Sequence, residues 1–174
     1  MKKLLIPGAA LVAVLALAAC GGSSSSSGSN ATGASNHTVA IKSIDGVGNV
    51  LVDSRGMPLY SSNLDTSGMP ACAGACVTIW KPLTIASGTP SAADGAGKVG
   101  VVMRADGTRQ VAIAGRPLYT FVKDSPGNVS GNGVSDAFSG RHFTWAAVLA
   151  GGKSAPAKAK GGSTSGGGYG GGGY

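Results

Sequence analysis

The sequence predicts an all-β fold built from two tandem repeats of three to four strands each, packed as a small sandwich or barrel. The first observation is an internal repeat: the segment Gly56–Gly68 returns as Gly115–Gly127, with Gly, Pro, Leu, Tyr, Asp and the closing Gly at identical spacing. The second is an Asp-Gly dipeptide between short apolar runs in each half, which is typical of β-hairpins. The third is that the two tryptophans stand near the ends of the two halves.

Each half is expected to form a three-stranded meander. The strand-like runs are 38–44, 49–53 and 58–62 in the first half and 99–104, 109–114 and 117–122 in the second. Asp45-Gly46 and Asp106-Gly107 supply the turns. The closing segments 78–83 and 143–149 carry Trp80 and Trp145, and we expect each tryptophan to fill the core of its own half, because tryptophan buries a large apolar area.

The repeated motif sets a tyrosine and an aspartate five residues apart, as Tyr60 with Asp65 and as Tyr119 with Asp124. Side chains alternate across a strand, so two residues five apart face opposite sides. This spacing argues against a Tyr–Asp catalytic pair on one surface. We expect the tyrosines to pack inward and the carboxylates to accept backbone N–H groups in the turns that close at Gly68 and Gly127.

The second copy, Tyr119-Thr-Phe121-Val-Lys-Asp124, resembles the Tyr-x-aromatic-x-x-Asp signature of a family of predicted bacterial lipoproteins, also called the secreted repeat of unknown function. The first copy departs from this signature, with Ser62 at the aromatic position. The tandem arrangement and the Cys-x-x-x-Cys-x-x-x-Trp stretch are similar to that family as well. The resemblance implies the architecture and an exported location, and it implies no biochemical activity.

The N-terminus has the layout of a lipoprotein signal peptide over residues 1–19: Lys2-Lys3, an apolar stretch, and then Leu17-Ala-Ala-Cys20. These last four residues resemble the bacterial lipobox, whose cysteine receives a diacylglycerol and becomes the new N-terminus. We therefore expect Cys20 to be lipidated and to anchor the chain at the outer face of the cell membrane, or in the outer membrane of a Gram-negative host.

The remaining chain divides by composition. Residues 20–36 form a Gly/Ser tether, 37–149 the repeat domain (37–90 and 91–149), and 150–174 a Lys/Gly-rich tail that we expect to be disordered.

Cys72 and Cys76 are the cysteines that remain once Cys20 is modified. In an exported protein, such a pair most often forms a disulfide. The alternative is a copper-binding or thiol-redox site, in which Met69 and His142 would complete a soft ligand set for Cu(I). The pair and Trp80 fit one face of a helical turn, and Gly68, Pro70 and Gly74 fit a tight loop equally well.

Composition narrows the function classes. The chain has 14 Lys and Arg against seven acidic residues, all of them Asp, so no Glu is present for acid–base chemistry. The basic residues are scattered without an aromatic platform, which argues against nucleic-acid binding. A mild cationic bias suits anionic cell-wall or envelope polymers. We expect a monomeric, non-catalytic binding or interaction module with no cofactor.

Overall fold

The computed structural model describes residues 37–66 and 68–157. The fold is almost entirely β, as predicted, with one four-residue helix, α1 (Cys76–Ile79), and one 3-10 turn, η1 (Ala150–Gly152). The strands are β1 (Val39–Ile44), β2 (Gly48–Asp53), β3 (Tyr60–Ser62), β4 (Trp80–Pro82), β5 (Thr84–Ile85), β6 (Val99–Met103), β7 (Arg109–Ile113), β8 (Arg116–Pro117), β9 (Tyr119–Phe121), β10 (Ser135–Phe138) and β11 (Arg141–Ala147). The predicted signal peptide, Cys20, the tether and residues 158–174 lie outside the described residues.

Both predicted Asp-Gly hairpins are confirmed. The β1–β2 pair runs from Val39↔Asp53 to Ile44↔Gly48, and the β6–β7 pair runs from Val99↔Ile113 to Met103↔Arg109. Gly46 and Gly107 have φ values of 73° and 78°, the left-handed conformation that these turns require.

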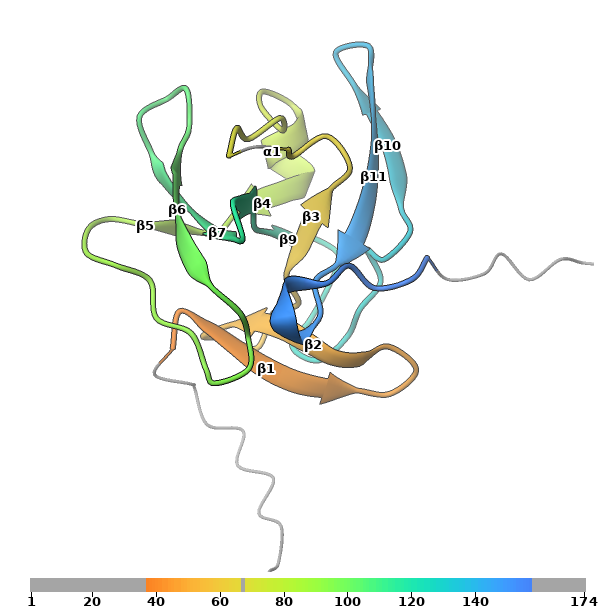
Figure 1. Ribbon diagram of the computed structural model, residues 1–174. Coiled ribbons are helices and arrows are strands. Elements are labelled where there is room, and N and C mark those ends of the chain that lie inside the picture. Colours follow the sequence, from red (N-terminus) through yellow and green to blue (C-terminus); the bar gives the residue numbers. More distant parts are fainter. Residues whose placement is uncertain (1–36, 67, 158–174) are drawn as a thin grey trace, which may run out of the picture. The chain divides into compact units, whose positions relative to one another are not determined.

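The two halves exchange strands in the central sheet. The central sheet has the order β10-β11-β3-β9-β4, in which β11 of the second half pairs with β3 of the first and β4 of the first half pairs with β9 of the second (Figure 1). The exchange is symmetric around the pair Tyr60↔Tyr119 at the centre of the sheet. Each half therefore completes the sheet of the other.

The predicted third strand of each half, 58–62 and 117–122, is split because its residues pair with two different sheets. In the first half, the Leu59 N–H donates to Leu51 O, whereas Leu59 O accepts the Val148 N–H. In the second half, Leu118 makes the equivalent bonds to Val111 and Leu83. The chain thus leaves one sheet at the leucine and enters the central sheet at the tyrosine. The strand β10 has no counterpart among the predicted strands.

Two hydrophobic clusters fill the interior between the sheets. One is aliphatic and lies between the β1–β2 and β6–β7 hairpins, with Leu51, Leu59, Val111, Leu118 and Val148 among its buried members. The other is aromatic and is formed by Tyr60, Trp80, Tyr119, Phe121, Phe143 and Trp145, together with both cysteines. Repeat-related residues therefore line both clusters.

Trp80 and Trp145 are fully buried, as expected for core anchors. The expectation that each fills its own half is wrong. Their rings stack on each other, with centroids 4.0 Å apart and an interplanar angle of 11°. The strand exchange places β4 and β11 in one central sheet, and both tryptophans enter the same aromatic cluster.

The described fold continues past residue 149, where composition places the start of the tail. The Leu149 N–H donates to Lys153 O, and the Ala155 N–H donates to Ala147 O. Ala155 is buried in the aromatic cluster. Residues 150–157 are therefore part of the domain in this structure.

Candidate functional site

The motif residues meet in two Tyr–Asp pairs, and each pair joins the two repeats. The Tyr60 hydroxyl donates to Asp124 at 2.5 Å, and the Tyr119 hydroxyl donates to Asp65 at 3.2 Å. Among the described residues, no hydrogen bond joins the tyrosine and the aspartate of one copy, and each aspartate lies past the end of its strand. The sequence spacing does not reveal that each tyrosine reaches the aspartate of the other copy, which follows from the strand exchange.

Both carboxylates also accept hydrogen bonds from nearby residues of their own repeat. Asp65 accepts the N–H and hydroxyl of Ser62 and the N–H of Ala71, at 3.1, 2.8 and 2.8 Å. Asp124 accepts the N–H and hydroxyl of Ser130, at 2.9 and 2.6 Å. Each carboxylate thus accepts a backbone N–H from just beyond the glycine that closes its turn: Ala71 beyond Gly68, and Ser130 beyond Gly127.

The tyrosine hydroxyls are poor acids in this setting. Burial and the neighbouring Asp124 raise the pKa of Tyr60 well above its ordinary value. Burial and the charge of Asp65 raise the pKa of Tyr119 in the same direction. Both hydroxyls therefore stay protonated and donate hydrogen bonds at physiological pH.

The aromatic residues form a continuous stack beside these pairs. Phe121 stacks on Trp80 with centroids 4.3 Å apart, and Trp80 stacks in turn on Trp145. The Trp80 indole N–H donates to Asp136 at 2.8 Å, whereas the buried Trp145 indole N–H has no partner among the described residues. Ser62 stands opposite Trp145 where Phe121 stands opposite Trp80, so the stack is asymmetric.

Cys72 and Cys76 form a disulfide, with Cα atoms 5.4 Å apart, at the entry to α1. Both cysteines are completely buried. Met69 is 77% exposed, and His142 lies exposed on β11. Within residues 37–66 and 68–157, no group of three His, Cys, Asp or Glu side chains is placed to hold a metal ion. The geometry thus favours the disulfide over the thiolate copper site.

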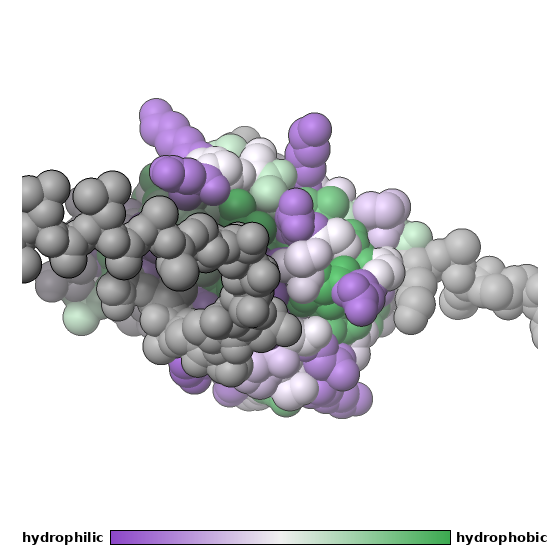
Figure 2. Space-filling view, turned by 90° about the horizontal axis from the view of Figure 1, so that it is seen from below, coloured by the Kyte–Doolittle hydropathy of each residue, from purple (hydrophilic) through white to green (hydrophobic). Residues whose placement is uncertain are grey.

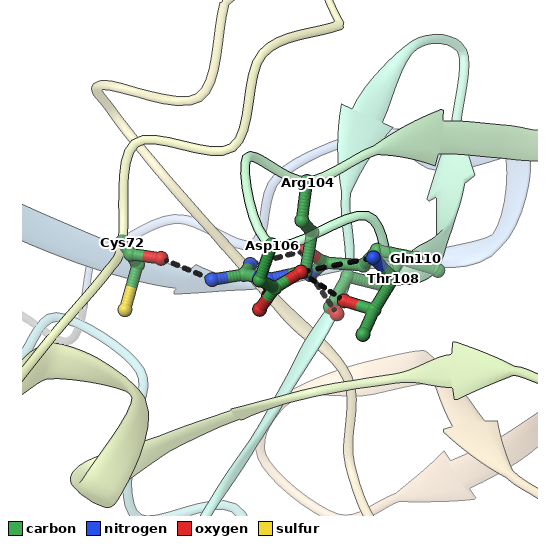
Figure 3. Close-up of polar contacts among 6 residues, drawn as sticks. Cys72, Arg104, Asp106, Thr108 and Gln110 are labelled. Carbon is green, nitrogen blue, oxygen red and sulfur yellow. Dashed lines mark hydrogen bonds and ion pairs between the residues drawn. The ribbon is translucent and has the colours of Figure 1, made fainter.

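A buried arginine ties the disulfide loop to the second repeat. Arg104 is 9% exposed, and its guanidinium donates to the Cys72 carbonyl at 2.8 Å and to the Gln110 side-chain oxygen at 2.7 Å. Asp106 lies 3.6 Å away at the exposed side, where Thr108 also binds it (Figure 3). Gln110 in turn donates to Leu118 O at 2.8 Å. This network fixes the loop that supplies Asp65 with its Ala71 donor.

Neither Arg104 nor Gln110 carries a signal in the sequence, because arginine in a turn is normally exposed. The registers of the two hairpins match when Val39 is aligned with Val99, and this alignment puts Ile44 and Val50 in the places of Arg104 and Gln110. The polar network is therefore a feature of one side of the domain. Arg104 and Cys72 are far apart in the chain, so their contact is visible in the structure and not in the sequence.

Hollows open on the surface at two places of the described chain that bear on the motif and its neighbours. The larger, of about 830 Å³, lies between the β1–β2 turn, residues 127–132 and residues 155–157. The smaller, of about 290 Å³, lies between residues 61–66 of the first repeat and Arg116, Thr144 and Ser154, and its lining residues are mainly polar. Arg116 donates to the Ser154 hydroxyl at 2.9 Å and to the Gly152 carbonyl. Part of its hydrogen-bonding capacity is therefore used within the domain.

The fold withdraws acidic groups from the surface. Of the seven aspartates, Asp53 and Asp65 are buried and Asp124 and Asp136 are half-buried, which leaves three exposed: Asp45, Asp94 and Asp106. Six basic residues of the described chain are exposed: Arg55, Lys81, Lys98, Lys123, Arg141 and Lys153. On the face in Figure 2, hydrophilic side chains project at separate places, and apolar residues reach the surface between them. The exposed surface is thus cationic without one dominant patch.

The fold and the crossed pairs define a two-repeat β domain in which each repeat completes the other. Residues 43–84 and 100–142 match a family described as a secreted repeat of unknown function, and the chain belongs to this family as a tandem pair. The protein is accordingly an exported one. Comparison with curated proteins and with solved structures gave no match. Among the described residues, no helix has both the length and the apolar character needed to cross a membrane.

Proposed function

We propose that the protein is a lipid-anchored envelope domain that binds a ligand instead of catalysing a reaction. The observation that supports this most strongly is the use of the motif itself. Both aspartates of the motif accept hydrogen bonds from nearby residues of their own repeat and from the tyrosine of the opposite repeat. A general acid or base needs access to a substrate, and these groups are committed to the scaffold.

The redox alternative finds less support. Thiol–disulfide exchange requires a thiolate to attack a sulfur atom directly. Cys72 and Cys76 are completely buried, and Cys76 is the first residue of α1. A sealed disulfide suits a structural role, in which it shapes the segment before Trp80.

Anchoring is tested by metabolic labelling with an alkyne analogue of palmitate, followed by membrane fractionation. Wild-type protein should carry the label and sediment with membranes. The Cys20→Ser variant should lose the label, whereas Cys72→Ser should keep it. Release of unlabelled wild-type protein into the medium would contradict the anchor.

The ligand class that the surface favours is an anionic envelope polymer. Six exposed cationic side chains against three exposed carboxylates give a net attraction that is screened by salt. Such a spread of charge suits a long polyanion better than one small anion.

Co-sedimentation with purified cell walls tests this, using walls before and after chemical removal of their anionic polymers. The domain should bind intact walls and lose most of that binding on stripped walls or at high salt. Replacing Lys81, Lys98 and Lys123 by Gln should weaken retention, and the matched variant with Asp45 and Asp94 changed to Asn should not. Equal retention on intact and stripped walls would refute the polyanion.

A further inference from the structure

Strand β6 forms an open edge of its sheet. The order of that sheet is β5-β7-β6, so β6 has β7 on one side only (Figure 1). Its five residues are half-buried or exposed, whereas four of the five residues of β7 are buried. The outer side of β6 pairs with no strand in the part of the chain that the structure describes.

The hydrogen bonds of β7 show which backbone groups of β6 point outward. The Val111 N–H donates to Leu83 O, and Val111 O accepts the Leu118 N–H, so Val111 turns both groups away from β6. Its register partner Val101 must therefore direct its own N–H and C=O away from β7. By alternation, Val99 and Met103 do the same, and no described group bonds to these outward N–H and C=O groups.

The first repeat shows how the equivalent edge is covered. Val39 is the first residue of β1, as Val99 is of β6. The Val39 N–H donates to Ser91 O at 3.0 Å, and Val39 O accepts the Ala93 N–H at 2.9 Å. The segment between the repeats thus adds to the edge of β1, and the edge of β6 lacks such a partner among the described residues.

The composition of β6 leaves this edge unprotected. Val99-Gly-Val-Val-Met103 contains no charge and no proline, which are two of the devices that block pairing at an edge. Met103 is 60% exposed. An apolar, uncharged edge with free donors and acceptors is suited to strand addition.

We propose that β6 is the docking site for β6 of a second copy of this chain, in an antiparallel pair centred on Val101. Val101 then faces its own counterpart and Val99 faces Met103, so three residue pairs exchange about six main-chain hydrogen bonds. The charges at the strand ends bear on this direction: exposed Lys98 precedes the strand, and Arg104 follows it with its guanidinium turned inward to Gln110 and the Cys72 carbonyl. Exposed Asp106 lies two residues beyond Arg104. Antiparallel pairing sets each Lys98 opposite the ion pair that Arg104 and Asp106 form in the second copy, whereas parallel in-register pairing would set Lys98 against Lys98 and Asp106 against Asp106.

Cysteine crosslinking tests this register. In such a pair the two Val101 Cα atoms lie about 5.5 Å apart, within the range of about 4.4–6.8 Å that a disulfide spans. The two Met103 Cα atoms lie about 14 Å apart, four residues along the strand. The test uses the full chain with Cys20→Ser, so that the introduced cysteine is the single free thiol beside the Cys72–Cys76 disulfide.

Under mild oxidation, Val101→Cys should form a covalent dimer at least fivefold faster than Met103→Cys, although Met103 is the more exposed position. An equimolar mixture of Val99→Cys and Met103→Cys chains should form the mixed dimer faster than either forms its own. Unchanged near-ultraviolet circular dichroism would show that each variant keeps its fold. Faster crosslinking of Met103→Cys to itself, or none by Val101→Cys, would overturn the proposal.

Discussion

At the scale of single residues, the two motif aspartates connect the repeats. Asp65 is 1% exposed and accepts four hydrogen bonds, from Ser62 twice, Ala71 and Tyr119. A buried carboxylate is costly unless its lone pairs are satisfied, and here all the donors come from the fold itself. Removing any one of these donors would leave part of the buried Asp65 carboxylate without a partner and would destabilise the domain.

Asp65→Asn should lower the free energy of unfolding by about 2–4 kcal/mol, because the amide nitrogen would face N–H and O–H donors that need an acceptor. Urea denaturation followed by tryptophan fluorescence measures the loss. The control is Asp94→Asn at an exposed site, which should change stability by less than about 0.5 kcal/mol. Equal effects of the two changes would contradict the assigned role of Asp65.

The buried tyrosines give the domain an alkaline limit. Their pKa values are raised by burial first and then by interaction with Asp124 and Asp65. A tyrosine titrates near pH 10 when unfolded, so its stabilising contribution is complete below that pH and is lost as the pH rises toward the folded pKa. Above pH 10, each tyrosine should lower stability by about 1.4 kcal/mol per pH unit.

Denaturation between pH 8 and 12 should show this decline. Tyr60→Phe should be less stable at neutral pH but should decline less steeply above pH 10, since one of the two buried phenols is gone. Lysine titration is common to both proteins and cancels in the comparison. Parallel curves would show that Tyr60 does not contribute.

At the scale of elements, local signals and long-range pairing differ in how well the sequence predicts them. The hairpins β1–β2 and β6–β7 follow from Asp-Gly turns between apolar runs, which is chemistry within a few residues. The exchange of β4 and β11 joins residues far apart in the chain, and no local pattern encodes it. For the same reason the motif residues could be found, whereas the crossed pairs and Arg104 could not.

The Cys72–Cys76 disulfide closes a very short loop before α1. Replacing both cysteines by Ala should cost about 2 kcal/mol, because a short loop loses little chain entropy on closure. Since both cysteines are fully buried, dithiothreitol should reduce the native protein only as fast as this segment opens. Thiol labelling after timed reduction measures the rate. Reduction as fast as in the urea-unfolded chain would contradict a sealed structural disulfide.

At the scale of the whole molecule, the two repeats form one folding unit. The Trp80–Trp145 stack, the Tyr60↔Tyr119 pair and the exchanged strands all cross between the halves. Neither repeat has a complete central sheet or aromatic cluster of its own, so unfolding should be cooperative. The tandem arrangement is thus a structural requirement of this fold as described.

The central claim is that the repeated Tyr and Asp join opposite repeats, and a pair of double-mutant cycles tests it most directly. The cycle of Tyr60→Phe with Asp124→Asn should give a coupling free energy of about 1.5–3 kcal/mol, as expected for a hydrogen bond to a charged group. The cycle of Tyr60→Phe with Asp65→Asn, within one repeat, should give less than about 0.5 kcal/mol. Stronger coupling within the repeat than between the repeats would contradict this account.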